Sequence, residues 1–160
     1  MLYRKTIASP LGELTLVSDD TALLVLVMDG QKYFDRHLPA DLTEGDTPVL
    51  QEAERWLTAY FSGVRMAAPS FPLSPRGTAF QQRVWAALRE FPYGETLSYG
   101  QLAAALGSSA RAVGAAVGRN PISILIPCHR VVGVRGSLTG YAGGLENKKR
   151  LLELEGALKP

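Results

Sequence analysis

Hydrophobic residues gather into three short runs near the start of the chain and predict three strands. The segments 2–8, 13–18 and 22–28 are rich in Leu, Val, Thr and Tyr, a composition typical of half-buried strands. Residues 9–12 and 19–20 separate these segments with Ser, Pro, Gly and Asp, which favour turns. Connections this short predict an antiparallel meander.

The apolar period lengthens after the strands and predicts a helix. Thr47 can cap its start, and Pro48 suits its first helical position. Apolar residues then recur every three or four positions as far as Phe61, and Gly63 stands where such a helix would end. We therefore expect a small α/β domain over residues 1–75.

The second half of the chain has a helical pattern. Residues 64–77 carry three prolines and a glycine and are typical of a linker. One apolar face then repeats at helical spacing over residues 80–88. The segment 98–101 has the form of a capping box and opens a helix that Gly107 closes. A second short helix, about 110–119, follows after a brief turn.

Two short helices joined by a turn containing glycine fit helix-turn-helix geometry, although ordinary packing produces the same shape. The predicted fold class is α/β. A small N-terminal antiparallel-sheet α/β domain, residues 1–75, precedes a mainly helical, winged helix-turn-helix-like domain, residues 76–160. The second helix is nearly all Ala and Gly, with arginines near its ends. Such a helix can press close to DNA while reading little sequence, or it can be a small-residue helix packed in a core.

Charge divides the chain unevenly. Residues 1–75 hold 6 Lys and Arg against 10 Asp and Glu, a net charge of −4, whereas residues 76–160 hold 11 against 5, a net charge of +6. The stretch from Thr96 to Leu145 contains no carboxylate. This asymmetry indicates a surface that faces a polyanion, unless it is an accident of composition.

Overall composition narrows the class of protein. A chain of 160 residues with 46% hydrophobic and 20% charged residues is typical of a globular domain, not of a disordered chain, a collagen or a coiled coil. The longest apolar run, residues 22–28, is too short to span a bilayer, and no secretory signal is evident. One cysteine excludes an intramolecular disulfide, and one cysteine with two histidines argues against structural zinc. We expect a cytoplasmic protein.

The chemistry centres on the sole cysteine. The apolar run 122–126 predicts a buried strand, which delivers Cys128, His129 and Arg130. An unperturbed thiol is only about 3% ionised at pH 7, and these basic neighbours should favour the reactive thiolate. A lone cysteine is also often only a small buried hydrophobe. Adjacent strand residues point to opposite faces, so a direct contact between Cys128 and His129 needs a turn or a bridging water.

Two features follow the cysteine. A glycine-rich loop, residues 133–144, can form one wall of a pocket. A final helix, about 146–154, ends at Gly156. Glu155 lies at its end, where the helix dipole disfavours a carboxylate, so we expect a specific partner, and His129 is the candidate.

These residues together resemble a known family. The motif Pro127-Cys128-His129-Arg130-Val131, preceded by Arg119-Asn120-Pro121 and followed by Tyr141-Ala142-Gly143-Gly144, resembles the O6-alkylguanine-DNA alkyltransferases. The resemblance extends over residues 76–160 and includes Ser98-Tyr99, the segment 110–114 and Glu155-Gly156. The N-terminal half is similar in pattern only.

The resemblance implies a suicide repair protein without cofactor or metal. It would flip an alkylated guanine out of the duplex and move the O6-alkyl group to its own cysteine. Cys128 matches the acceptor, His129 the base that acts through a water, and Glu155 the group that orients the imidazole. Tyr99 matches the tyrosine that donates toward the guanine, and Asn120 the asparagine that braces the recognition helix.

The resemblance also implies a DNA interface and a substrate pocket. The partner is double-stranded DNA carrying O6-alkylguanine, bound in the minor groove by a monomer, with no membrane involved. Arg111 matches the arginine that fills the stack after flipping. The other expected DNA contacts are Ser98, Ala110, Ala112, Gly114, Arg119 and Arg130. The expected pocket residues are Val131, Tyr141 and Ala142. Ser123 and Ala142 depart from residues common in the family and affect pocket shape.

The residues support this chemistry independently of the resemblance. Dealkylation at an sp³ carbon needs a soft, strong nucleophile, and thiolate is the best that side chains offer. The thioether product has no hydrolytic route back, so one cysteine allows one turnover. Two other classes remain open from the residues alone: a cysteine hydrolase of acyl groups, and a helix-turn-helix binder without catalysis.

Overall fold

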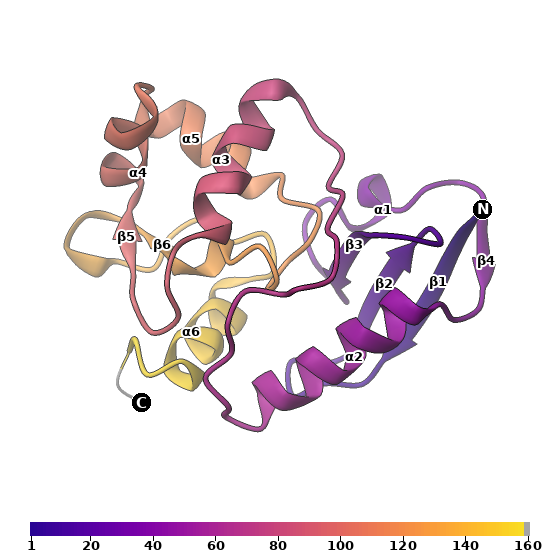
Figure 1. The fold of residues 1–160 in the computed structure, drawn as a ribbon. Helices are drawn as coiled ribbons and strands as arrows, with labels where there is room; N and C mark the ends of the chain where they lie inside the picture. The colour runs from indigo at the N-terminus through magenta and orange to yellow at the C-terminus, as the bar shows by residue number, and fades with distance from the viewer. Residues whose placement is uncertain (159–160) are drawn as a thin grey trace.

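The computed structural model describes residues 1–158, and its two halves lie side by side (Figure 1). The last two residues of the predicted second domain, 159–160, lie outside this range. The N-terminal half is a four-stranded sheet in the order β3-β2-β1-β4. Its strands are β1 (Leu2–Ile7), β2 (Leu14–Ser18), β3 (Leu23–Met28) and β4 (Leu42–Glu44).

The predicted meander is confirmed, because β1 pairs antiparallel with β2 and β2 with β3. Two short elements were not predicted. The strand β4 pairs parallel with β1, and α1 (Phe34–His37) is a single helical turn. Both are too short to show a period: β4 has three residues, two of them exposed.

The predicted first helix is α2 (Pro48–Phe61). The Thr47 hydroxyl accepts a hydrogen bond from the Leu50 N–H at 3.1 Å, and Pro48 occupies the first turn. Gly63 follows the helix with φ 95°, a left-handed conformation that favours glycine. The buried face of α2 packs on the sheet and ends at Tyr60.

The C-terminal half is mainly helical, as predicted. Its helices are α3 (Ala79–Arg89), α4 (Tyr99–Leu106), α5 (Ala110–Gly118) and α6 (Leu145–Leu154), with β5 (Leu97–Ser98) parallel to β6 (Val131–Val132) and 3-10 turns at Cys128–Arg130 and Val134–Gly136. The capping box of Ser98 and Gln101 is present, and Gly107 ends α4 at φ 64°. Ser109 caps α5, so the predicted helix-turn-helix pair is confirmed.

The predicted strand at residues 122–126 is wrong. Ile122 forms a single bridge with Leu26 of β3, and the chain then bends, with Ile124 at φ 71°. The Asn120 side-chain amide donates to the carbonyls of Ile122 and Ile126 at 3.3 and 2.8 Å, which closes the run into a turn. An apolar run predicts burial, which all five residues show, but it does not fix the backbone conformation.

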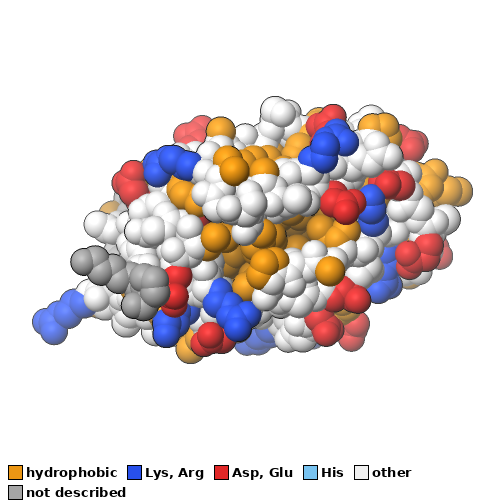
Figure 2. Space-filling view, turned by 90° about the horizontal axis from the view of Figure 1, so that it is seen from below, with side chains coloured by type: hydrophobic (Ala, Val, Ile, Leu, Met, Phe, Trp, Pro, Cys, Tyr) orange, Lys and Arg blue, Asp and Glu red, His pale blue; other side chains and the backbone are white. Residues whose placement is uncertain are grey.

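The two halves share one hydrophobic core. The edge strand β3 forms backbone hydrogen bonds with the linker, where Leu23 bonds to Pro72 and Ser74. It also forms backbone hydrogen bonds with the loop before the cysteine, where Leu26 bonds to Pro121 and Ser123. Figure 2 shows hydrophobic side chains around a hollow on one face, with charges of both signs at its rim. Among the described residues, no helix has the length and apolar content needed to cross a membrane.

Candidate active site around Cys128

Cys128 lies in the 3-10 turn that follows the bent loop, and only 4% of the residue is exposed. Its N–H donates to the Ile126 carbonyl at 2.7 Å. His129 is the next residue of the same tight turn, and it is fully buried. The segment is a turn and not a strand, so the geometry that points adjacent strand residues to opposite faces does not apply here.

His129 pairs with Glu155, which confirms the predicted contact. The Nε2 atom of His129 lies 2.6 Å from Oε2 of Glu155, and neither side chain is exposed. The other ring nitrogen, Nδ1, is buried and has no hydrogen-bond partner within residues 1–158. A carboxylate opposite Nε2 selects the tautomer that carries its hydrogen there. Nδ1 is then left as a proton acceptor on the ring.

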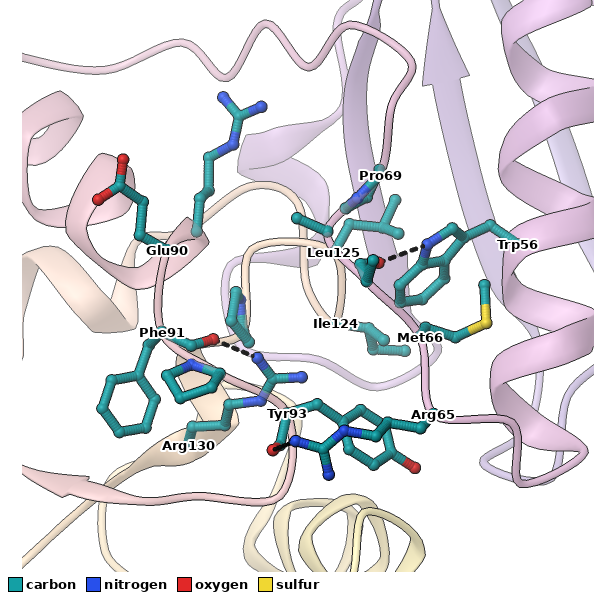
Figure 3. Close-up of a pocket in the computed structure, with 15 residues that line it drawn as sticks. Trp56, Arg65, Met66, Pro69, Glu90, Phe91, Tyr93, Ile124, Leu125 and Arg130 are labelled. Carbon is teal, nitrogen blue, oxygen red and sulfur yellow. Dashed lines mark hydrogen bonds between the residues drawn. The ribbon is translucent and has the colours of Figure 1, made fainter.

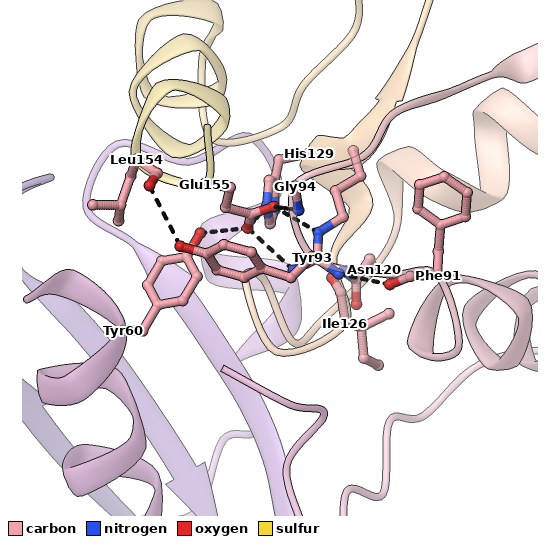
Figure 4. Close-up of polar contacts among 10 residues, drawn as sticks. Tyr60, Phe91, Tyr93, Gly94, Asn120, Ile126, His129, Leu154 and Glu155 are labelled. Atoms are coloured by element: carbon pink, nitrogen blue, oxygen red, sulfur yellow. Dashed lines mark hydrogen bonds and ion pairs between the residues drawn. The ribbon is translucent and has the colours of Figure 1, made fainter. Parts of the chain in front are cut away.

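Glu155 is also held by the next residue of the cysteine turn and by donors from two further segments (Figure 4). Arg130 donates from Nε to Oε1 at 2.8 Å and from Nη2 to Oε2 at 3.2 Å. The Tyr60 hydroxyl donates to Oε2 at 2.6 Å, and the Gly94 N–H lies 3.5 Å from Oε1. Burial alone would raise the pKa of Glu155, but hydrogen bonds from His129 and Arg130, the charge of Arg130 and, in acid, the charge of protonated His129 lower it to about 2. The carboxylate is therefore ionised at neutral pH.

His129 is neutral in this arrangement. Burial lowers the pKa of its imidazole, and the nearby charges of Arg130 and Lys148 act in the same direction, against the attraction of Glu155. Since Arg130 already balances the carboxylate, the buried group needs no second cation. A neutral imidazole with a free Nδ1 can take a proton from a neighbouring donor.

The expectation that its neighbours make Cys128 a thiolate is wrong for the resting protein. Burial raises the pKa of the Cys128 thiol, and this outweighs a hydrogen bond from Asn120 and the charge of Lys148. Moving an ion out of water costs more than these partners return. The thiol stays protonated until a base removes its proton.

Arg130 is not placed to contact DNA, contrary to the prediction. The residue is 7% exposed, and its guanidinium is used by Glu155 and by the Phe91 carbonyl, to which Nη1 donates at 2.7 Å. It lines a cavity of about 640 Å³ beside Trp56, Tyr93 and the linker (Figure 3). The sequence cannot show this, because charge alone does not distinguish a surface arginine from a buried one.

Asn120 sits between α5 and the bent loop, as a brace would. In addition to its two donated bonds, its Oδ1 accepts from the Ile122 N–H at 3.0 Å. Every polar atom of the side chain therefore holds the loop that positions Cys128.

Lys148 is a site residue that the sequence reasoning missed. It is fully buried in α6, and its ammonium donates to the carbonyls of Val131 and Thr139. Burial lowers its pKa to about 8, against the attraction of Cys128. A signal was present: Lys148 precedes Leu151 and Leu152 by three and four positions, which puts it on the apolar face of the helix.

The expected pocket residues lie in β6 and in the glycine-rich loop, with Tyr141 near Cys128. Val131 is fully buried, and the Tyr141 hydroxyl is buried without a partner among the described residues. Ala142 accepts a bond from the Lys32 N–H at 2.8 Å, which ties the loop to the N-terminal half. The Tyr99 hydroxyl lies 3.2 Å from the Thr139 carbonyl. It must leave this carbonyl in order to donate to a substrate.

The face of α5 carries the expected contact residues near the surface. Ala110, Arg111 and Ala112 are exposed and Gly114 is half-buried, while the opposite face of the helix is packed in the core. The guanidinium of Arg119 lies 4.2 Å from the ring centre of Tyr33. The Ser98 hydroxyl accepts from the Gln101 N–H as the helix cap, at 3.0 Å.

The described residues contain no group of three His, Cys, Asp or Glu side chains that could hold a metal ion.

Two family profiles match the chain. Residues 2–75 match the ribonuclease-like domain of 6-O-methylguanine DNA methyltransferase, and residues 79–157 match its DNA binding domain. The chain belongs to this methyltransferase family.

Other members are similar over their whole length. Methylated-DNA–protein-cysteine methyltransferase of Methanosarcina acetivorans is 45% identical, with 98% of this chain and 99% of that protein covered. The crystal structure of Mycobacterium tuberculosis OGT in complex with DNA is 46% identical, with a TM-score of 0.87 over 97% of this chain and 93% of that one. The methyltransferase of Pyrococcus kodakaraensis has a TM-score of 0.70 at 27% identity, covering 98% and 99% of the two chains. The chain therefore shares its fold with O6-methylguanine-DNA methyltransferases. One of the matching structures, that of M. tuberculosis OGT, is a complex with DNA.

Proposed function

We propose that this protein repairs DNA by direct reversal of damage, moving the alkyl group of O6-alkylguanine irreversibly to Cys128. One observation carries the proposal: a buried thiol adjoins a neutral imidazole that is held on one nitrogen by an ionised carboxylate and bare on the other. That set of groups can activate a nucleophile.

The bonds that change are few. The thiol proton passes through a water to Nδ1 of His129. This ring nitrogen is buried and has no hydrogen-bond partner among the described residues, so it can accept the proton. The sulfur then forms a bond to the alkyl carbon, and the bond from that carbon to O6 breaks. Tyr99 donates a hydrogen bond to the leaving guanine. His129 then releases the proton it took from the thiol, and the departing guanine anion takes up one proton, so that hydrogen replaces the alkyl group on the base. The thioether is stable, so each molecule acts once.

The target atom lies within the base stack, so the nucleotide must rotate out of the duplex at a cost of a few kcal/mol. The protein binds as a monomer with α5 in the minor groove, and Arg111 fills the vacated stack. Ser98, Ala110, Ala112, Gly114 and Arg119 border the same groove. A helix surface of Ala and Gly fits closely without reading sequence, as a repair protein requires.

A burst assay with duplex DNA labelled on the methyl group of O6-methylguanine tests the proposal. We expect one equivalent of label fixed on the protein and then no further reaction. Sustained release of label would instead indicate a hydrolase. Binding without label transfer would leave only a DNA-binding module.

A further inference from the structure

Glu155 meets a donor from the far half of the chain. Tyr60 lies in the last turn of α2, 95 residues away, is fully buried, and donates to Oε2 at 2.6 Å. Two rings fix its position. Trp56 stacks on it at 5.3 Å between ring centres, and Tyr93 packs edge-on at 6.2 Å. The hydroxyl is thus held against the carboxylate by one ring of its own domain and one ring of the C-terminal domain.

The two oxygens of Glu155 are used differently. Arg130 spans both of them, whereas Tyr60 and His129 share Oε2 at equal distances. A carboxylate oxygen has two lone pairs in the plane of the group. Tyr60, together with Arg130 Nη2 at 3.2 Å, occupies the other approaches to Oε2 and so restricts the direction from which the imidazole can bind.

Tyr60 is a permanent donor here. Burial and the charge of Glu155 raise the pKa of its hydroxyl well above the ordinary value. A donor that draws charge from Oε2 weakens the pull of this oxygen on a second proton, so it disfavours the imidazolium form of His129. The same contact orients the carboxylate that orients the imidazole.

We infer that Tyr60 is a positioning residue of the relay, through which the N-terminal domain sets the orientation of Glu155 and keeps His129 ready to accept a proton. The inference rests on the proposed function. It assigns the N-terminal domain a part in the chemistry in addition to support.

The test compares Tyr60→Phe with Tyr93→Phe as the matched control. Both changes remove one hydroxyl from a buried aromatic ring, but the Tyr93 hydroxyl lies 3.4 Å from the backbone carbonyl of Leu154 and does not bond to the carboxylate. Single-turnover transfer is measured from pH 5 to 9. The histidine rings are also titrated by NMR in ¹³C-labelled protein, with His37 as internal reference.

For Tyr60→Phe, the plateau rate should fall about 3- to 10-fold. The acid midpoint of transfer and the pKa of His129 should both rise by about half to one pH unit, as expected for losing one bond to a charged group. Tyr93→Phe should leave both midpoints unchanged. A purely structural role would lower the melting temperature of Tyr60→Phe without moving either midpoint, and that result would overturn the inference.

A second variant covers the case in which Tyr60→Phe does not fold. Site-specific 3-fluorotyrosine at position 60 is nearly isosteric and a stronger donor, so it should lower both midpoints. Midpoints that rise or stay fixed would also overturn the inference. If the wild-type protein transferred no label at any pH, the proposed function would fail, while the His129 titration would still decide the role of Tyr60.

Discussion

The exposed face of α5 and the buried relay around Glu155 are assembled in opposite ways. The α5 face comes from neighbouring residues of one helix, most of them Ala or Gly, that are largely exposed to solvent. The relay joins side chains from α2, the cysteine turn and the end of α6, and each is fixed by another. Substitutions on the first surface should therefore have small and separable effects, whereas substitutions in the relay should have large effects that do not add.

The largest effect is expected at the nucleophile. Cys128→Ala should abolish transfer and keep DNA binding, because the cysteine is buried and the expected DNA contacts lie elsewhere. Label transfer and duplex affinity are measured on the same preparation. Transfer that persists in this variant would remove Cys128 from its proposed role.

The relay should act as a unit. His129→Ala and Glu155→Gln should each slow single-turnover transfer by about 10²–10⁴, the usual contribution of positioned acid–base groups. The double variant should be barely slower than the worse single variant. His37→Ala, the other histidine, serves as the control and should be unchanged. Losses that multiply would show two independent groups and would weaken the contrast with α5.

Acid should destabilise the relay. The pKa of Glu155 is about 2 in the folded protein, against an ordinary value of 4.5. Above pH 4.5 the ionised carboxylate therefore adds about 3 kcal/mol to the free energy of unfolding, and this contribution is lost as the pH falls toward 2. His129 acts with the same sign, because its lowered pKa favours the unfolded state below its ordinary 6.5. Urea unfolding at a series of pH values should show a flatter curve for Glu155→Gln. Glu153→Gln, at a partly exposed neighbour, should follow the wild type.

Arg111 separates duplex repair from chemistry. Arg111→Ala should slow repair of duplex DNA about tenfold or more, since flipping costs a few kcal/mol. Reaction with free O6-benzylguanine, which needs no flipping, should keep its rate. Equal losses on both substrates would mean that Arg111 has no part in flipping.

The smallest effect concerns salt. Three arginines of the acid-free stretch, Arg111, Arg119 and Arg135, are exposed, whereas Arg130 is buried. The log–log slope of DNA affinity against salt should be about −3, and Arg119→Ala should reduce its size by about 0.9. Arg55→Ala on α2 is the control and should leave the slope unchanged. A wild-type slope near −4 that becomes shallower when Arg130 is replaced would show that Arg130 does contact DNA.

The sequence predicts those parts of the fold that local chemistry determines. Thr47 with Pro48, and Ser98 with Gln101, mark helix starts because the capping partners are only a few residues apart. The contact of Glu155 with His129 was also predicted, since a carboxylate at a helix end needs a partner.

Contacts between distant segments were not predictable in the same way. In the sequence, Tyr60 is one more position of the apolar face of α2. Its hydroxyl reaches Glu155 only because the two halves pack together. The loop at 122–126 bends because Asn120 and the edge of β3 take its polar groups. Arg130 is buried against Phe91 and Glu155, which lie 39 and 25 positions away, so no local pattern encodes its burial.

The edge strand β3 has a consequence for solubility. Its sequence, Leu-Leu-Val-Leu-Val-Met, is uncharged and rich in β-formers, the kind of segment that recruits other chains into aggregates when it is left open. Here the linker covers one end through Leu23, and the loop before Cys128 covers the other through Leu26. The loop that positions the nucleophile therefore also acts as a gatekeeper against aggregation. Variants that detach this loop should be lost from solution before their activity can be measured.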